Sequence, residues 1–397
     1  MSLLLSRLAP RIVEEDGAFR TRMLSIAAGL TDVIALGRGD PDFHTPAHIV
    51  EAAKAALDAN HHHYTGPTGI PALREAIADN LGARYGLDYG ADEVVVTAGA
   101  QEAIMLTMLG LCSPGDEVLI TSPRFTTYDT AVGLCGGTPI PVPTFERDDF
   151  ALDVVEIEKR ITPRTRMFVL VSPNNPTGAV TPPEAIRAIA ELAIEHDLII
   201  VADEIYDGLD YTGKHVSCAS RSNGVPVITL NGVSKNYYAP GWRVGYMAWH
   251  DPDGRMVDVR DGAERLLRSR LCASTPAQLG YLAGLTSDKG WMDSYRDGLL
   301  RRRDLCVERI SGIEGLEVEA PGGSFYMLVR LTDPHWAADD KKFVLDLLHE
   351  EHVLLVHGSG FSPEYGCGHF RLVFLPDLDV LNEAFDRIDR FLQRHRG

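Results

Sequence analysis

Short apolar runs alternate with segments of helical periodicity through the middle of the chain. One unit begins with "MFVLVSP", Met167 to Pro173, continues as "TPPEAIRAIAELAIEH", and returns as "LIIVADE". The two outer runs are short and rich in β-branched residues, whereas Ile186, Ile189, Ala190 and Ala193 repeat at helical spacing between them. The pattern predicts a βαβ unit, and hence a largely parallel sheet.

The helix of this unit carries sequence signals for its start. Thr181 can cap it, prolines occupy the first turn, and Glu184 follows three residues after Thr181, as in a capping box. We therefore predict that the helix begins directly after Thr181.

The same alternation extends in both directions along the chain. "EVVVTAGA", "DEVLITSP", "VPVITLN" and "RVGYMAW" each predict a further strand. From Pro276 to about Ile313 the pattern is mostly helical, with a break near residues 287–290, and this segment could link two domains. The remaining runs, "GLEVEAPGGSFYMLVRL", "KKFVLDLLHEE" and "HFRLVFL", predict a smaller α+β domain.

The predicted fold class is α/β, with a mainly parallel central sheet flanked by helices. The large domain is expected to cover 47–295, and the smaller domain is expected to be built from both termini, 1–46 and 296–397. A chain of 397 residues is long enough for two such cores.

Composition and charge exclude several classes of protein. Hydrophobic residues at 45% and charged residues at 24% are typical of an ordered globular protein. A net charge of -18 would repel nucleic acid and anionic membranes. The opening "MSLLLSRLAP" soon meets "EEDG", unlike a signal peptide or a membrane span, so a cytoplasmic location is expected.

No metal site is predicted. The six cysteines lie far apart and form no C-x-x-C pair. In "HHHY", His61 to Tyr64, three adjacent histidines cannot all face one site, and "HEEH", His349 to His352, lacks the spacing of H-E-x-x-H.

Small, polar and aromatic residues follow the predicted strands, where ligands bind in open α/β sheets. Each has an ordinary explanation, such as a turn, a helix cap or a surface lysine. Together they provide a helix N-terminus for an anion, a flat ring, an amide, a carboxylate with a phenol, and an amine. In chain order they are Gly99, Ala100 and Gln101, then Phe125, Asn175, Asp203 and Tyr206, and finally Lys235.

Those groups suit a flat phosphorylated aromatic aldehyde such as pyridoxal phosphate. A lysine amine can form a Schiff base with the aldehyde when burial and a cationic neighbour such as Arg243 favour its neutral form. A carboxylate beside the ring nitrogen keeps that nitrogen protonated, so the ring can take up electrons, a task that suits Asp203. Tyr206 and Asn175 would tune the imine from the ring oxygen.

Ten stretches, in this order, resemble the class I and II aminotransferases of fold type I, from about Leu36 to Arg371. They are "LGRGDPDF", "YTGPTGIPALREAI", "TAGAQEAI", "SPRFTTYD", "SPNNPTGAV", "ADEIYDGL", "NGVSKNYYAPGWRVGY", "STPAQ", "PGGSFY" and "FRLVF". The resemblance implies a pyridoxal-phosphate-dependent transaminase that moves an amino group from an L-amino acid to a 2-oxoacid in two half-reactions. A lyase, decarboxylase or synthase of the same fold is the alternative.

The resemblance also implies roles for individual residues. Lys235 is the Schiff-base lysine and the base that moves a proton between Cα and the cofactor's C4' atom. Asp203 pairs with the pyridine nitrogen, while Tyr206 and Asn175 reach the ring oxygen. The implied phosphate and ring contacts are Gly99, Ala100, Gln101 and Arg243 for the phosphate and Phe125 for the ring.

Two further implications concern the substrate and the subunits. Arg371 would grip the substrate α-carboxylate with bidentate geometry, helped by Asn175 and the backbone at Gly39. Tyr64 resembles the family tyrosine that crosses to the neighbouring subunit's phosphate, which implies a homodimer. One departure is Gly232, which stands where many relatives carry a phosphate-binding serine.

Substrate choice stays open at the level of sequence. Arg270 lies six residues before Pro276, the spacing at which some aspartate aminotransferases place an arginine for the distal carboxylate across the dimer. Against that, "SPRFTTYD" is more similar to the branch that acts on aromatic and broad neutral substrates. A surface role for Arg270 is an equal alternative.

Overall fold

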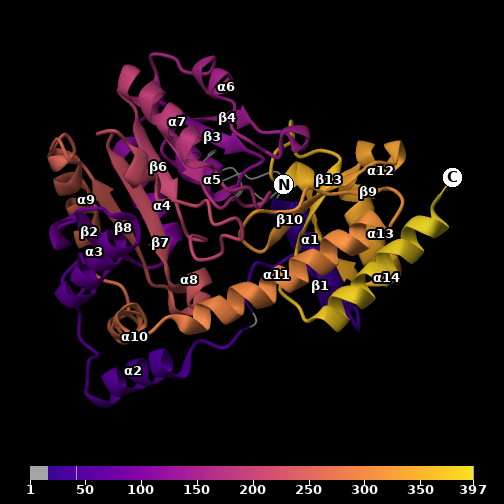
Figure 1. Cartoon of the computed structure of the whole chain (residues 1–397), viewed down its shortest axis with the longest axis horizontal. Coiled ribbons are helices and arrows are strands. Elements are labelled where there is room, and N and C mark those ends of the chain that lie inside the picture. Colours follow the sequence, from indigo (N-terminus) through magenta and orange to yellow (C-terminus); the bar gives the residue numbers. More distant parts are fainter. Residues whose placement is uncertain (1–16, 42, 397) are drawn as a thin grey trace, which may run out of the picture.

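The computed structural model describes residues 17–41 and 43–396. It shows a large central sheet covered by helices and a smaller sheet with its own helices, which lie side by side (Figure 1). The predicted α/β class is confirmed. The opening "MSLLLSRLAP" and Asp42, which falls within "LGRGDPDF", lie outside the described residues.

Seven strands form the central sheet of the described chain, in the order β2-β8-β7-β6-β5-β3-β4. All neighbours are parallel except β8, which runs antiparallel to both β2 and β7. Six of these strands were predicted from their apolar runs. The bounds are β2 Val94–Thr97, β3 Glu117–Ser122, β4 Thr138–Pro143, β5 Thr165–Val171, β6 Ile199–Asp203, β7 Val227–Gly232 and β8 Gly245–His250.

Both faces of the sheet are buried, because alternate residues of each strand pack under different helices. In β5, Met167, Val169 and Val171 face the cluster that includes α4, α5 and α9, whereas Phe168 and Leu170 face the cluster that includes α6 and α7. The helices of this part are α2 Ala47–Asp58, α3 Pro71–Tyr85, α4 Ala100–Leu111, α5 Thr127–Leu134, α6 Val154–Glu158, α7 Pro183–Glu195, α8 Val233–Asn236, α9 Val257–Arg270 and α10 Thr275–Thr286.

Helix α7 has the predicted buried face but not the predicted start. It begins at Pro183, with Pro182 at the N-cap position and no side-chain cap, so the prediction that Thr181 caps it is wrong. The backbone N–H of Thr181 instead donates to Ser172 Oγ at 2.9 Å. Thr181 therefore ties the preceding loop to the end of β5.

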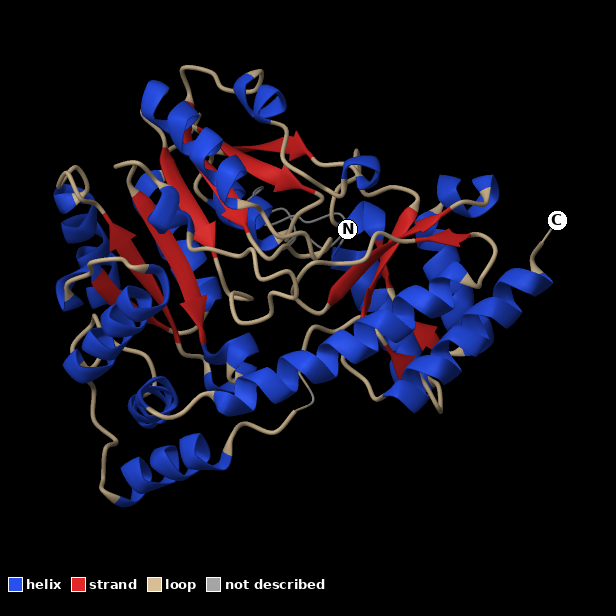
Figure 2. Cartoon of the chain, in the orientation of Figure 1, coloured by secondary structure: helices blue, strands red, loops and turns tan. Residues whose placement is uncertain are grey.

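The smaller domain contains a four-stranded antiparallel sheet, β12-β13-β10-β9, and a parallel pair, β1-β11 (Figure 2). The pair joins a strand near the start of the described chain to one near its end. These strands are β1 Ile34–Ala35, β9 Leu316–Glu317, β10 Tyr326–Leu331, β11 Val353–Leu354, β12 Val356–His357 and β13 His369–Val373. The helices are α1 Gly17–Gly29, α11 Gly290–Ser311, α12 Pro334–Ala338, α13 Asp340–Glu351 and α14 Leu378–Arg394.

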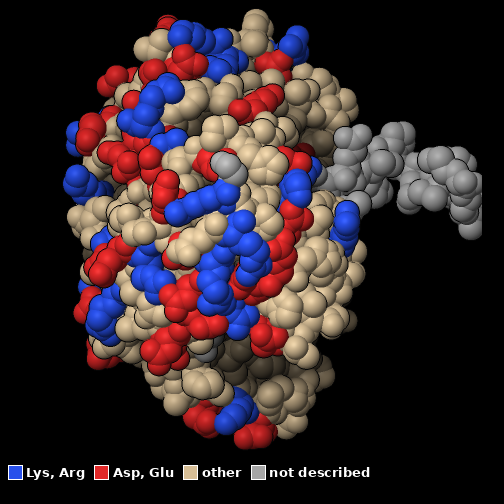
Figure 3. All heavy atoms as spheres, turned by 90° about the vertical axis from the view of Figure 1, so that its right-hand side faces the viewer, with Lys and Arg blue, Asp and Glu red and all other residues tan. Residues whose placement is uncertain are grey.

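Helix α11 runs from the central sheet to the smaller domain (Figure 1), after the predicted break. On the outer face of the smaller domain, acidic and basic side chains are interspersed (Figure 3). Ion pairs between helices of the smaller domain include Arg309 with Asp386 and Arg394 with Glu350. The predicted domain boundaries stay a prediction.

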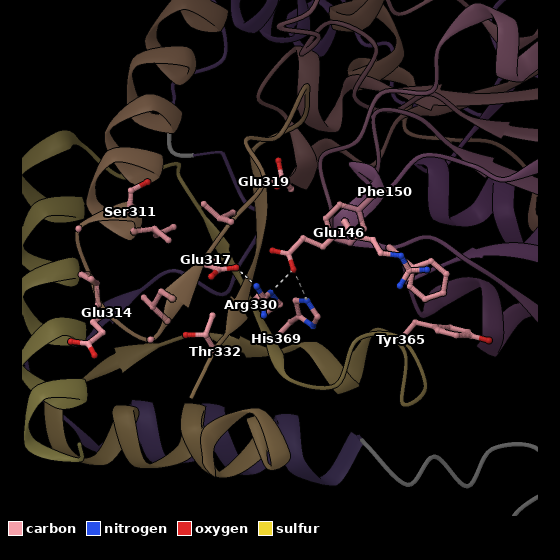
Figure 4. Close-up of a pocket in the computed structure, with 18 of the residues that line it drawn as sticks. Glu146, Phe150, Ser311, Glu314, Glu317, Glu319, Arg330, Thr332, Tyr365 and His369 are labelled. Atoms are coloured by element: carbon pink, nitrogen blue, oxygen red, sulfur yellow. Dashed lines mark hydrogen bonds and ion pairs between the residues drawn. The ribbon is translucent and has the colours of Figure 1, made fainter. Parts of the chain in front are cut away.

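A cavity of about 1110 Å³ lies between the two parts of the chain (Figure 4). Arg330, from β10, reaches Glu146 of the large part at 2.8 Å and also pairs with Glu317 of β9. His369 lies 3.8 Å from the same Glu146. None of the predicted site residues lines this cavity. We therefore regard it as a contact region with ion pairs between the two parts, and not as the reaction site.

Candidate active site

Asp203 is the last residue of β6 and is almost completely buried. The Tyr128 hydroxyl donates to Asp203 Oδ2 at 2.9 Å, and the backbone N–H of Ile205 donates to Oδ1 at 3.2 Å. Burial raises the pKa of Asp203 to about 6, although these two donors and the charge of Lys235 act in the opposite direction. The carboxylate is thus held in place, and a cation beside it would favour its charged form.

Lys235 lies in the short helix α8, which follows β7. Its Nζ donates to the Gly39 carbonyl oxygen at 2.6 Å and lies 5.5 Å from the centre of the Phe325 ring. The next residue, Asn236, donates to buried Asp207, which also accepts from Arg84. This buried network fixes α8 against the segment after β6, and therefore fixes the start of the Lys235 side chain.

Three glycines bring the start of α4 against β7 and β8. A Cβ at Gly232 would lie 2.7 Å from the backbone of β8, and a Cβ at Gly245 would lie 2.7 Å from the N atom of Ala100. Gly99 has φ +83 and a Cβ there would overlap the guanidinium of Arg243. The backbone crowding at Gly232 explains why this chain has no serine there.

The first N–H groups of a helix lack partners within the helix and favour anions. In α4 those groups belong to Ala100 and Gln101, and Arg243 adds a positive charge beside them. The Arg243 guanidinium is held by the carbonyl oxygens of Pro240, at 2.9 Å, and Ala98, at 3.3 Å. Helix, glycines and arginine together form a cradle for a phosphate-sized anion.

Arg371, in β13, is buried among aromatic rings. Its Nη1 donates to Asn175 Oδ1 at 2.9 Å and its Nη2 to the Gly37 carbonyl oxygen at 2.7 Å, while its Nε has no partner in the described structure. Its guanidinium carbon lies 4.4 Å from the Tyr326 ring centre and 4.7 Å from the Phe361 ring centre. A buried guanidinium with no paired carboxylate is a suitable site for a ligand carboxylate.

Tyr206 completes the cluster. Its hydroxyl lies 3.0 Å from the Tyr326 hydroxyl, and its electrostatic neighbours include Asp203 and Arg371. Burial raises the pKa of Tyr206 well above its ordinary value, and Tyr326 acts in the same direction, so the phenol stays protonated. The structure thus brings Lys235, Asp203, Tyr206 and the Arg371–Asn175 pair together.

The sequence patterns did not predict a place in the site for Tyr128 or Tyr326, which contact Asp203 and Tyr206. Both lie inside stretches that carry the resemblance, "SPRFTTYD" and "PGGSFY". The only signal was an aromatic residue with a polar tip in each stretch, and such a residue usually finds a hydrogen-bond partner when it is buried.

The roles predicted for three further residues stay predictions. Phe125 packs at the edge of the core cluster next to β3, and its carbonyl oxygen accepts from the N–H of Tyr128. Tyr64 is 78% exposed. Arg270, at the end of α9, is 3.3 Å from Glu102 in the first turn of α4, and its Nη2 donates to the Val96 carbonyl oxygen at 2.6 Å.

Across residues 17–41 and 43–396, no three His, Cys, Asp or Glu side chains are grouped so that they could hold a metal ion. Over the same ranges, none of the helices has the length and apolar character that crossing a bilayer requires. The cytoplasmic location stays a prediction.

Glu204, next to Asp203, is expected to make the free energy of unfolding depend on pH. Burial raises its pKa from 4.5 to about 8, although Cys218 N–H and Ser217 Oγ donate to Oε1. The folded protein therefore holds one more proton than the unfolded chain between these pH values, and stability falls as pH rises through this window. We expect Glu204→Gln to remove a slope of up to ~1.4 kcal/mol per pH unit in the free energy of unfolding.

The measurement is the thermal midpoint of the cofactor-loaded protein from pH 5 to pH 9. Glu184→Gln is the matched control, because Glu184 is exposed in the first turn of α7. Identical pH slopes for Glu204→Gln and the unmodified protein would contradict the prediction.

Comparison with known proteins agrees with this geometry. Residues 31–388 match the family described as "Aminotransferase class I and II". The chain is 35% identical to aromatic-amino-acid aminotransferase 2 of Thermococcus litoralis, covering 94% of this chain and 95% of the relative. It is 36% identical to aspartate/prephenate aminotransferase of Thermus thermophilus, covering 95% of each chain.

A solved structure, alanine aminotransferase from Pyrococcus furiosus, superimposes with a TM-score of 0.94 at 40% identity, covering 98% of this chain and 100% of that one. Family match, relatives and fold all point the same way. The chain belongs to the class I and II aminotransferases, and is a pyridoxal-phosphate-dependent aminotransferase.

Proposed function

We propose that Lys235, Asp203, Tyr206, Asn175 and Arg371 carry an amino-group transfer from an L-amino acid to a 2-oxoacid in two half-reactions. The proposal rests on three groups that lie close together. They are the Lys235 amine after β7, the buried Asp203 carboxylate at the end of β6, and the buried Arg371 guanidinium on β13, which donates to Asn175 after β5 and has no carboxylate partner among the described residues. When bound, the cofactor supplies an aldehyde that joins an amine and a ring that takes up electrons.

The residues present fit pyridoxal phosphate. The cradle formed by Gly99, Ala100, Gln101 and Arg243 supplies N–H donors and positive charge for its phosphate. Asp203, whose burial disfavours an unpaired charge, is suited to a protonated ring nitrogen. Phe125 would supply a flat apolar surface for the ring, and it is joined to the Asp203 side through Tyr128, whose N–H donates to the Phe125 carbonyl oxygen and whose hydroxyl donates to Asp203.

Lys235 has two tasks in this proposal. Its amine would hold the cofactor by joining the aldehyde, and it would later move a proton between the substrate Cα and the cofactor's C4' atom. The Gly39 carbonyl oxygen holds the free amine at 2.6 Å, which keeps Nζ within the site. Asn175 and Tyr206 would donate to the ring oxygen, and Asp203 would keep the ring nitrogen protonated.

Arg371 binds the substrate α-carboxylate in this proposal. Asn175 fixes one of its terminal nitrogens, and the Gly37 carbonyl oxygen fixes the other. A planar guanidinium that is held on both sides loses little freedom when it binds a carboxylate in a bidentate manner. The substrate Cα is thereby held near Lys235.

The protein is also proposed to act as a homodimer. Tyr64 is 78% exposed on the loop between α2 and α3. A phenol that is to reach the phosphate of a second subunit must project from its own chain in this way. Domain boundaries at 47–295, with 1–46 and 296–397 forming the smaller domain, are part of the same proposal.

Single-turnover spectra test the reaction type. Mixing the loaded protein with one amino acid should convert the cofactor to pyridoxamine phosphate and release the matching keto acid. A lyase, decarboxylase or synthase would instead release a fragment of the amino acid or carbon dioxide. Finding those products without the keto acid would overturn the proposed half-reactions.

For the amino acid itself we propose a neutral or aromatic side chain. Tyr326 and Phe361 flank Arg371, and the charge of Arg270 is already paired with Glu102. A second candidate, an acidic side chain, is favoured by Arg20 of α1. The pKa of Arg371 is lowered chiefly by burial, and the charge of Arg20 acts in the same direction, so the two guanidinium groups lie close enough to interact.

Arg270→Ala distinguishes two possible roles of this arginine: binding the distal carboxylate of a substrate, and supporting the start of α4. Because Arg270 is ion-paired with Glu102 and donates to the Val96 carbonyl oxygen, we expect the substitution to loosen the start of α4 and to weaken pyridoxal phosphate binding. Half-reaction rates with aspartate and with phenylalanine should fall by an equal factor, on the order of tenfold. The rates are measured by single turnover at one cofactor concentration.

The control is Arg268→Ala, which removes an exposed arginine from the same last turn of α9. A loss confined to aspartate would show that Arg270 reads a distal carboxylate and would contradict the structural role.

A further inference from the structure

Tyr326 lies between the two ends of the proposed site. The residue is buried, its hydroxyl is 3.0 Å from the Tyr206 hydroxyl, and the two rings meet edge to face at 5.6 Å. The guanidinium carbon of Arg371 lies over the same ring, 4.4 Å from its centre. One side chain therefore contacts both the proposed carboxylate binder and the proposed ring-oxygen ligand.

The Tyr326 hydroxyl also touches the segment that holds the lysine. A Cβ added at Gly39 would overlap the Tyr326 hydroxyl, so no side chain fits between them. The carbonyl oxygen of this same Gly39 accepts from Lys235 Nζ. Tyr326 thus lies against the backbone that orients the free amine.

Hydrogen bonding gives this placement a chemical effect. In the structure the Tyr206 hydroxyl donates to the Tyr326 hydroxyl. A phenol has one proton but can also accept, so when Tyr206 gives its proton to a ligand oxygen, Tyr326 can donate to Tyr206 in turn. A hydroxyl that accepts one hydrogen bond becomes a stronger donor in the next. The charged or titratable groups that face Tyr206 are Tyr326, Asp203 and Arg371, and among them only Tyr326 is hydrogen-bonded to it.

We propose that Tyr326 is a positioning residue for the reaction, which orients the Tyr206 hydroxyl so that it donates to the cofactor ring oxygen. The proposal rests on the proposed function of Lys235 and Tyr206. A donor to the ring oxygen would draw off part of its negative charge, so the oxygen would attract the proton on the lysine-linked nitrogen less strongly, and that nitrogen would lose its proton at a lower pH. Tyr326 thereby sets the pH at which that nitrogen loses its proton.

The test is a spectrophotometric pH titration of the cofactor-loaded protein, without substrate. Tyr326→Phe keeps the ring under Arg371 but removes the hydroxyl. We expect the midpoint of the visible absorbance change to rise by about half to one pH unit. The KM for the amino acid should change little, because the ring contact with Arg371 remains.

The decisive comparison is a double-mutant cycle with Tyr206→Phe. If Tyr326 acts through Tyr206, Tyr326→Phe should cause no further shift in the Tyr206→Phe background. An equal shift in both backgrounds, or no shift in either, would overturn the proposal. Tyr206→Phe alone also distinguishes failure of the role proposed for Tyr326 from failure of the role proposed for Tyr206. A normal midpoint for that variant would overturn the proposed role of Tyr206 itself.

Two further variants guard against loss of structure. Tyr89→Phe removes another buried hydroxyl, next to His250 at the far end of β8, and should leave the midpoint unchanged. Tyr326→Leu removes the ring as well, and should raise the KM in addition to shifting the midpoint. A midpoint shift of the same size in Tyr89→Phe would assign the effect to general loosening and overturn the specific role.

Discussion

Replacing Lys235 with alanine is expected to slow the half-reaction by about 10⁴-fold. The substitution removes both the amine that would join the aldehyde and the group that would move the proton. Lys289, which lies beside Asp207 and Asn236, is hydrogen-bonded to Asn80. The measurement is the single-turnover rate with phenylalanine, together with the visible absorbance of the loaded protein and the site of borohydride labelling.

Lys214→Ala is the matched control, because Lys214 is exposed and lies outside the cluster. That variant should keep the rate, the absorbance and a label on residue 235. The assignment of Lys235 would be wrong if its alanine variant kept a normal rate, or if the label in the unmodified protein mapped to another lysine.

Asp203→Asn is expected to lower the rate of the same half-reaction by roughly 10²- to 10³-fold. Asparagine keeps the size of the side chain: its single oxygen can accept from the Ile205 N–H, and its NH2 group can donate to the Tyr128 hydroxyl. It lacks the charge that would keep a ring nitrogen protonated. Single-turnover rates and the affinity for pyridoxal phosphate should both fall, whereas thermal stability without cofactor should not fall, because the native carboxylate is costly to bury.

Tyr128→Phe distinguishes the effect of the Asp203 charge from the effect of the position of its carboxylate. It leaves the carboxylate in place but removes its buried donor, so the rate should fall less than in Asp203→Asn. Equal losses in the two variants would mean that the placement of Asp203, rather than its charge, supports the reaction.

Strands that are buried on both faces were predictable because their apolar runs need no tertiary context. The exception is β4, "TPIPVP", whose three prolines argue against a strand. It lies at the edge of the sheet and pairs only with β3, where missing N–H groups are tolerated. An edge position follows from topology, and no local sequence pattern specifies it.

In the site, too, some residues could be predicted from local sequence and others only from tertiary packing. Asp203, Lys235 and Asn175 follow predicted strands, so their convergence could be inferred. The roles of Tyr128 and Tyr326 depend on partners 75 and 120 residues away in the chain. Such contacts are fixed by how the smaller domain and α5 pack against the sheet, and no spacing along the chain encodes them.

The contact between Gly99, Gly232 and Gly245 has a consequence for protein engineering. A Cβ at Gly245 would meet the backbone at the start of α4, one at Gly232 would meet the backbone at the start of β8, and one at Gly99 would meet the Arg243 guanidinium. Even alanine would therefore force the backbone or Arg243 to shift. Random libraries that include these three codons would yield mostly inactive clones. Diversity aimed at new amino-acid preference is better placed around Phe361 and Arg20, where side chains rather than backbones meet.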